Sequence, residues 1–252
     1  MTNKLKYFVG NWKMFGDFAS FKIINKISNF YLQNKTKIKV RIVLCVPNTL
    51  IYFFKQKIKP KSVFLGAQNC HYSQNYGPFT GNVNSMMLKK SGANYIILGH
   101  SENRALGEKN KIIKMKIESA LKSNLVVILC IGETLKEKNK KKTLSVLKEQ
   151  IINCITKNKN FSKIILAYEP VWSIGTNKVP NLIDLQKIIK YIKSEYVKIY
   201  RTQKQPIVLY GGSVNPMNIK LFSSINEIDG FLIGGASQSS KKFIDIIRNY
   251  YK

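Results

Sequence analysis

Ala167-Tyr168-Glu169-Pro170-Val171-Trp172-Ser173-Ile174-Gly175-Thr176-Asn177-Lys178 is the stretch that decides how the rest of the chain is interpreted. It completes the apolar run Ile164-Ile165-Leu166, which predicts a parallel strand buried on both faces. Glu169 stands where this strand stops, because Pro170 cannot donate a further ladder hydrogen bond. The apolar, glycine-bearing segment that follows is typical of a lid that excludes water from a reacting group. The stretch therefore favours a catalytic base with a lid over a strand that ends by chance in a glutamate.

Short apolar runs like this one recur along the whole sequence. Amphipathic helical stretches lie between most of them; Ile113, Ile117, Ala120 and Leu121, for example, share one helical face. Strands that alternate with helices indicate a parallel sheet, and eight strands are the number that closes a (β/α)8 barrel. No composition break divides the chain, so we predict an α/β fold with a single barrel domain over residues 1–252. The predicted strands are residues 7–9, 41–46, 63–67, 95–98, 125–130, 164–168, 206–210 and 230–233.

The charge of the chain is unusual, since 42 Lys and Arg residues face 13 Asp and Glu residues and give a formal net charge of +29. Such an excess is typical of nucleic-acid binders. However, only Arg41, Arg104, Arg201 and Arg248 are arginines, the residue that reads bases with two hydrogen bonds. The lysines are spread over the chain, so we interpret them as a solvated surface and expect no specific nucleic-acid partner.

Cysteine usage and hydropathy indicate the compartment. Cys45, Cys70, Cys130 and Cys154 form no C-x-x-C pair, which argues against a zinc site and against a disulfide scaffold. No apolar run reaches the ~20 residues that a membrane-spanning helix needs. We therefore expect a cytoplasmic protein without a membrane partner.

Polar residues at the other predicted strand ends point to a site. Active sites of such barrels lie at the carboxyl ends of the strands. Asn11 and Lys13 follow the first strand, where a cation faces an anionic substrate. His100 follows the fourth strand, where an imidazole can polarise a carbonyl. The last two strands end in the glycine pairs 211–212 and 234–235, and paired glycine loops at this position are typical of a phosphate site.

Five short motifs follow one another along the chain: Gly10-Asn11-Trp12-Lys13, Gly99-His100-Ser101-Glu102, Cys130-Ile131-Gly132-Glu133, Tyr210-Gly211-Gly212-Ser213 and Gly234-Gly235-Ala236-Ser237. Together with the lid they resemble the triosephosphate isomerase family over the whole chain. The resemblance implies interconversion of dihydroxyacetone phosphate and D-glyceraldehyde 3-phosphate through an enediolate. It requires neither a metal nor an organic cofactor.

The resemblance also implies a role for each matching residue. Glu169 would be the base, His100 the electrophile, and Lys13 and Asn11 the further catalytic groups. Glu102 would be a buried supporting carboxylate, and Cys130 would pack near Glu169. The loop of residues 74–83 would enter a partner subunit of a homodimer, with Thr80 approaching the neighbouring active site. The substrate-binding residues would be Asn11, Lys13, Gly175, Ser213, Gly234 and Gly235.

The chain departs from the family pattern at the lid and at the expected interface. Ser173 replaces the usual alanine, Asn177 the usual glycine, and Pro180 lies at the far hinge. Asn82 and Asn103 stand where the family usually carries a glutamate and an arginine. These departures remove no catalytic group.

Two alternatives to the isomerase remain. Another phosphate-binding barrel enzyme would share the glycine pairs, but it would not need Lys13, His100, Glu169 and the lid together. A basic nucleic-acid-binding protein on a retired barrel would explain the charge and leave the intact site unexplained.

Overall fold

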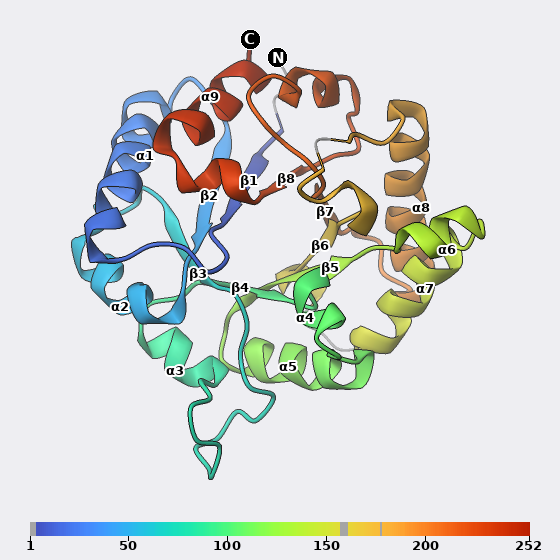
Figure 1. Ribbon diagram of the computed structural model, residues 1–252, viewed down its shortest axis with the longest axis horizontal. Helices are drawn as coiled ribbons and strands as arrows, with labels where there is room; N and C mark the ends of the chain where they lie inside the picture. The colour runs from blue at the N-terminus through green and yellow to red at the C-terminus, as the bar shows by residue number, and fades with distance from the viewer. Residues whose placement is uncertain (1–3, 157–160, 177) are drawn as a thin grey trace.

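Eight parallel strands close into a barrel in the order β1-β2-β3-β4-β5-β6-β7-β8, and helices surround it (Figure 1). The computed structural model describes residues 4–156, 161–176 and 178–252. The strands are β1 Lys6–Asn11, β2 Val40–Cys45, β3 Phe64–Ala67, β4 Tyr95–Leu98, β5 Val126–Ile131, β6 Ile164–Tyr168, β7 Ile207–Tyr210 and β8 Gly230–Ile233. The α-helices are α1 Phe21–Asn34, α2 Asn48–Lys57, α3 Ser85–Lys90, α4 Ser101–Ala105, α5 Asn110–Lys122, α6 Leu135–Asn139, α7 Thr143–Cys154, α8 Leu182–Tyr200 and α9 Ser240–Tyr250. Short 3-10 helices are η1 Phe18–Ser20, η2 Phe161–Lys163, η3 Val171–Ser173, η4 Ile219–Ser224 and η5 Gly235–Gln238.

The structure confirms the predicted (β/α)8 barrel, and each predicted strand is present. The ranges of β4, β6 and β8 agree with the prediction at both ends. β1 is longer than predicted, because it pairs with β2 from Lys6 opposite Val40 to Asn11 opposite Cys45. Such pairing extends a strand beyond the apolar run by which the sequence signals it.

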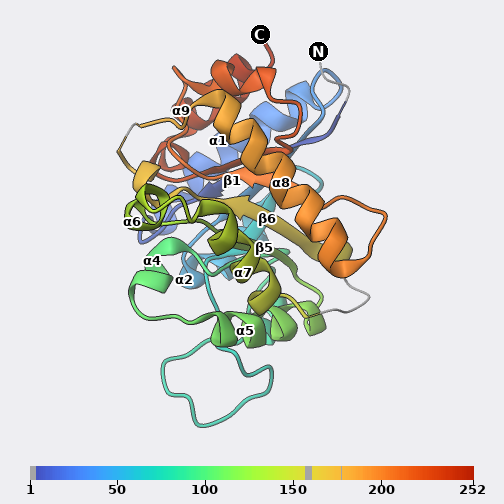
Figure 2. The same cartoon turned by 90° about the vertical axis from the view of Figure 1, so that its right-hand side faces the viewer.

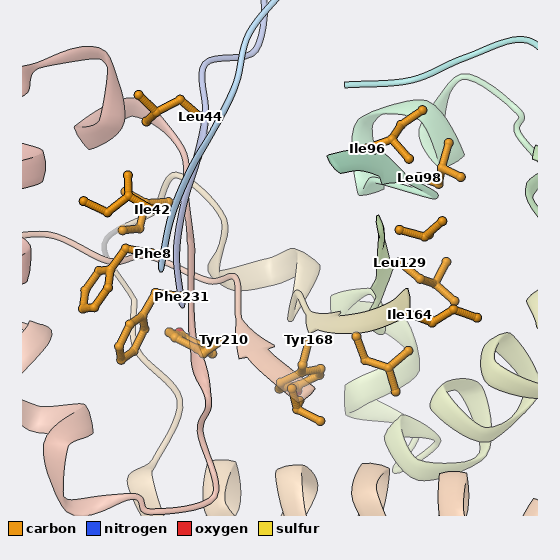
Figure 3. Close-up of a cluster of buried hydrophobic side chains, with 14 of the residues drawn as sticks. Phe8, Ile42, Leu44, Ile96, Leu98, Leu129, Ile164, Tyr168, Tyr210 and Phe231 are labelled. Atoms are coloured by element: carbon orange, nitrogen blue, oxygen red, sulfur yellow. The ribbon is translucent and has the colours of Figure 1, made fainter. Parts of the chain in front are cut away.

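The strands are apolar because both of their faces are buried. Side chains that point inward fill the barrel, so its interior is a packed core. Side chains that point outward meet the helices (Figure 3). The inward cluster is Tyr7, Val9, Val43, Cys45, Tyr95, Ile97, Ile128, Cys130, Ile165, Ala167, Leu209 and Leu232. Outward-facing residues include Phe8, Ile42, Leu44, Ile96, Leu98, Leu129, Ile164, Tyr168, Tyr210 and Phe231.

The helices α5 and α8 bury the faces that their sequence periods predict. In α5 the buried residues include Ile113, Ile117, Ala120 and Leu121, as expected. In α8 the buried face includes Leu185, Ile189, Ile192 and Tyr196, while Leu182 in the first turn is half-buried. None of the helices in the described ranges combines the length and the apolarity needed to cross a membrane.

A cluster of charged residues, all buried except Lys4, lies where the first and last strands of the barrel meet. β1 pairs with β8, with Tyr7 opposite Gly230. Lys6 is buried and donates its ammonium proton to the carbonyl of Ile228. Asp229, also buried, lies 2.5 Å from Lys4 Nζ and 2.6 Å from Lys193 Nζ. The closure of the barrel therefore rests on charge pairing as well as on the strand ladder.

The loop of residues 68–84 between β3 and α3 extends away from the barrel (Figures 1 and 2). Tyr76 in the middle of this segment is 67% exposed. His71 is packed within the loop, with its ring centroid 4.1 Å from those of Tyr72 and Phe79. Its Nδ1 accepts a hydrogen bond from the Ser73 backbone. In the described ranges no three His, Cys, Asp or Glu side chains gather into a group that could hold a metal.

Candidate active site

A cavity of about 900 Å³ opens at the carboxyl ends of the strands. Its lining includes every residue that the sequence analysis assigns to catalysis or substrate binding. These residues come from loops that are far apart in sequence, and the barrel brings them to one end. They are Asn11, Lys13, His100, Glu169, Gly175, Ser213, Gly234 and Gly235.

Glu169 is buried directly after β6, and two glycines make room for it. Its backbone N–H donates to the carbonyl of Ile131 at 2.8 Å. A β-carbon at Gly132 would lie 1.8 Å from the Glu169 carbonyl oxygen, and one at Gly211 would lie 2.8 Å from its Cγ. Its Oε1 lies 3.2 Å from His100 Nε2, and its buried Oε2 has no hydrogen-bond partner among the described residues. One carboxylate oxygen therefore remains to accept a proton from a substrate.

His100 caps the N-terminus of α4, and this position sets its tautomer. Its Nδ1 accepts a hydrogen bond from the backbone N–H of Glu102 at 3.3 Å. The neutral ring therefore carries its proton on Nε2, the atom that faces the cavity. Burial lowers the pKa of His100, but the carboxylates of Glu169 and Glu102 raise it by more, so the net shift is upward.

Lys13 is held in an unusual backbone conformation at the mouth of the barrel. Its φ of +56° lies in the left-handed region, which costs energy for a residue with a side chain. Its N–H donates to Asn11 Oδ1 at 3.1 Å, and its carbonyl accepts from Gln68 Nε2 at 2.9 Å. Its ammonium lies 2.5 Å from Glu102 Oε1. Asn11 thus has an observed contact that fixes the loop carrying Lys13.

The expectation that Glu102 is buried is wrong. Its side chain is 56% exposed, because it stands in the first turn of the short helix α4 on the solvent side. It still contacts the site, since it pairs with Lys13 and its Oε2 lies 3.6 Å from His100 Nδ1. The supporting role of Glu102 therefore stays a prediction. Water screens the charge of its exposed carboxylate.

Cys130 is buried inside the barrel, and it lies beside Glu169 as the sequence analysis predicts. Burial raises the pKa of its thiol well above the usual value, and the neighbouring Glu169 carboxylate adds to the rise. A neutral thiol is a poor nucleophile. The geometry therefore agrees with a packing role.

The lid begins with η3, which is anchored by the buried carboxylate of Glu133. Trp172 donates its indole N–H to Glu133 Oε1 at 2.8 Å, and the Tyr168 hydroxyl donates to both carboxylate oxygens. Burial raises the pKa of Glu133, although these hydrogen bonds oppose the rise. Lys138 Nζ lies 3.3 Å from the centroid of the Trp172 ring. Glu133 belongs to a motif in the sequence, but its role as an anchor for the lid follows only from these contacts in three dimensions.

Ser173 contacts both the far part of the lid and the residues at the end of β7. Its buried hydroxyl donates to the carbonyl of Lys178 at 2.5 Å and lies 3.4 Å from the Tyr210 hydroxyl. The Ser213 hydroxyl donates to the Ser173 carbonyl at 2.7 Å. Gly175 has a φ of +71°, which a residue with a side chain rarely adopts. Pro180 is buried, and the departure at Asn177 lies outside the described residues.

The two glycine pairs border the same cavity. A β-carbon at Gly235 would meet nothing within 4 Å, so this backbone faces open space in the cavity. η5 begins at Gly235, and Gly234 alone separates it from the end of β8. A backbone of this kind at a helix start can approach an anion closely. Thr80, in contrast, lies in the exposed loop of residues 68–84 and does not line the cavity.

Several cavity residues were not predicted from the sequence. The loop after β7 contributes a group that includes Asn215, Met217 and Asn218, and α9 contributes Lys242. Asn218 Nδ2 donates to the Ser213 carbonyl at 3.0 Å and so fixes this loop. Lys242 lies in the first turn of α9, the α-helix that follows the last glycine pair, and this position was a signal in the sequence. Because lysine is abundant throughout the chain, the signal did not distinguish Lys242 from the other lysines.

Fold and cavity together define a (β/α)8-barrel enzyme whose site combines an acid–base pair with glycine loops suited to an anion. The sequence profile of the triosephosphate isomerase family matches residues 6–250. The chain belongs to the triosephosphate isomerase family.

Individual relatives agree over the full length. The chain is 36% identical to the triosephosphate isomerase of Bartonella tribocorum, over 95% of this chain and 94% of that protein. It is 39% identical to that of Mycoplasma mobile, over 96% and 99%. The crystal structure of triosephosphate isomerase from Bartonella henselae superposes with a TM-score of 0.88 at 33% identity, and covers 98% of this chain and 99% of that one.

Proposed function

We propose that this cavity interconverts dihydroxyacetone phosphate and D-glyceraldehyde 3-phosphate. The observation that carries the proposal is the meeting of Glu169 and His100 at 3.2 Å inside a cavity bordered by two glycine pairs. The family and its named relatives support the same reaction. No observation favours another phosphate-binding barrel enzyme or a nucleic-acid-binding protein.

Proton transfer starts at Glu169. Its Oε2, which has no hydrogen-bond partner in the described ranges, abstracts the proton from the carbon beside the carbonyl and returns it to the neighbouring carbon. His100 donates from Nε2 to the oxygen on which negative charge develops, which is the established division of roles in triosephosphate isomerases. The substrate oxygen thereby replaces Glu169 Oε1 as the partner of Nε2.

Charge is compensated from the first strand end. Lys13 stands beside the developing enediolate, and Asn11 fixes the loop that carries it. A donor held in place before the reaction costs no reorganisation when charge develops. The strain energy of the Lys13 backbone is therefore already present in the folded state, and this conformation keeps the Lys13 side chain at the mouth of the barrel.

The phosphate group of the substrate binds at the glycine loops, beside Lys13, whose Cε would lie 3.6 Å from a β-carbon at Gly234. Ser213, Gly234 and Gly235 surround it, and Gly175 from the lid closes over it. Closure keeps water from the enediolate, which otherwise loses its phosphate. Glu102 and Cys130 act through the residues they contact and do not touch the substrate.

The assembly is a homodimer in the cytoplasm. The loop of residues 68–84 supports this proposal, since it extends beyond the barrel (Figure 2) and carries the exposed Tyr76. Thr80 in this loop would approach the active site of the partner subunit.

The variant Glu169→Gln tests the proposed chemistry. It keeps the shape of the side chain but removes the base, so kcat should fall by a factor of about 10³ or more with little change in KM. A coupled assay with D-glyceraldehyde 3-phosphate measures both constants. Glu149→Gln, at an exposed position outside the cavity, is the matched control and should retain full activity. Full activity of Glu169→Gln would overturn the proposal.

A further inference from the structure

Lys13 alone offers a phosphorylated substrate little positive charge in this cavity. Among the described residues, the lining contains two cationic side chains, Lys13 and Lys242. The ammonium of Lys13 is already paired with Glu102 at 2.5 Å, and Glu169 adds a negative charge nearby. A substrate phosphate brings a charge of about −1.5 to −2 at neutral pH. Of the two cationic lining residues that the structure describes, Lys242 is therefore the one without an ion-pair partner and is available to this substrate.

The position of Lys242 is set by the helix that carries it. It is the third residue of α9, and its backbone N–H donates to the capping hydroxyl of Ser239 at 3.4 Å. Phe243, the next residue, is fully buried and fixes the rotation of the helix. Lys242 thus lines the cavity together with Gly234 and Gly235, at the side of the glycine loops. In the described part of the chain its ammonium forms no ion pair.

Its neighbour shows that this placement is specific. Lys241 is also exposed and precedes Lys242 directly, but it does not line the cavity. The two lysines carry the same charge one residue apart, and they differ in what they face. A general excess of lysine on the surface does not account for this difference.

We propose that Lys242 is a substrate-binding residue that attracts and contacts the phosphate group at the mouth of the cavity. The inference rests on the proposed function and extends it to a group outside the glycine loops. A lysine side chain is flexible and acts as a compact point charge, so it can follow a phosphate into a closing site. A partly exposed cation of this kind also raises the rate at which anions arrive, and salt weakens the effect.

The test compares Lys242→Gln with Lys241→Gln. In buffer of 10 mM ionic strength, Lys242→Gln should lower kcat/KM for D-glyceraldehyde 3-phosphate by about tenfold, mainly through KM. In 1 M sodium chloride the loss should shrink to about twofold, since the Debye length falls from about 30 to 3 Å. Inorganic phosphate should inhibit the variant less strongly in the same proportion. Lys241→Gln should change none of these quantities by more than about twofold.

A neutral substrate separates binding of phosphate from a structural effect. D-Glyceraldehyde lacks the phosphate, so the ratio of kcat/KM for the phosphorylated and the neutral substrate should fall about tenfold in Lys242→Gln. Lys242→Arg keeps the charge and should restore most of the ratio. An unchanged ratio, or equal losses in the Lys241 and Lys242 variants, would overturn the inference. Loss of activity in Glu169→Gln would still support the proposed function in that case, so the two failures can be told apart.

Discussion

At the scale of single residues, His100 is controlled by opposing influences. A helix N-terminus and burial favour its neutral form, whereas the carboxylates of Glu169 and Glu102 favour the charged form and prevail. In the free enzyme, a charged His100 would hold Glu169 in an ion pair and weaken it as a base. The active form of the free enzyme is therefore the neutral imidazole beside an ionised carboxylate.

This balance predicts the acid side of the pH profile. Because the pKa of His100 is raised, kcat/KM should begin to fall with acidification at a pH above the ordinary histidine value of about 6.5. Glu102→Gln removes one of the carboxylates that raise this pKa, so the acid limb should move to lower pH. The substrate phosphate titrates equally in both proteins, and a comparison of the two profiles cancels its contribution. Coincident profiles would show that Glu102 does not act on His100.

Residue positions could be predicted from the sequence where a motif fixes both the residue and its strand end. Glu169, His100 and Lys13 are of this kind, and they meet in the cavity as expected. The exposure of Glu102 could not be predicted, because it depends on how much of a short helix its neighbours cover. The position of Lys242 in the cavity could not be predicted for a similar reason. Only the rotation of α9 about its axis determines that Lys242, and not Lys241, lines the cavity.

At the scale of elements, the lid is held by hydrogen bonds that could not be predicted from the sequence. The fully buried Ser173 hydroxyl bonds to the carbonyl of Lys178, five residues further along the lid. Strands are easier to predict, because burial on both faces leaves an apolar run. Short 3-10 helices such as η3 have no comparable period, so the sequence gives only a loop there.

Removing this fastening should destabilise the protein. Ser173→Ala deletes a buried donor and leaves the Lys178 carbonyl with one partner fewer, which should lower the free energy of unfolding by about 1 kcal/mol. Urea denaturation measures the change. Ser223→Ala is the control, because its hydroxyl makes the same kind of bond to the Lys220 carbonyl at an exposed position. Equal effects of the two substitutions would contradict the view that burial gives the Ser173 bond its value.

At the scale of the whole molecule, the proposed dimer has asparagines where the resemblance to the family implies a glutamate and an arginine. Asn82 is exposed on the projecting loop, and Asn103 is half-buried in α4. Two amides can satisfy each other or water, whereas a single buried charge without a partner is costly. Either Asn82→Glu or Asn103→Arg alone should therefore weaken dimerisation, and the double change should recover part of the loss. A double-mutant cycle on the dimer dissociation constant should give a coupling of about 0.5–3 kcal/mol, and a coupling near zero would show that the two side chains do not meet.

The seam between β1 and β8 determines when this barrel can be completed during its synthesis. Lys6 and Ile228, which bond across the seam, lie 222 residues apart in the chain. At the usual rate of ~5–20 residues per second, a ribosome needs roughly 10 to 45 s to make the intervening chain. Throughout that time the first strand has an open edge, and such an edge is able to pair with other chains. The nascent chain must therefore avoid such pairing until β8, one of its last elements, has been synthesised.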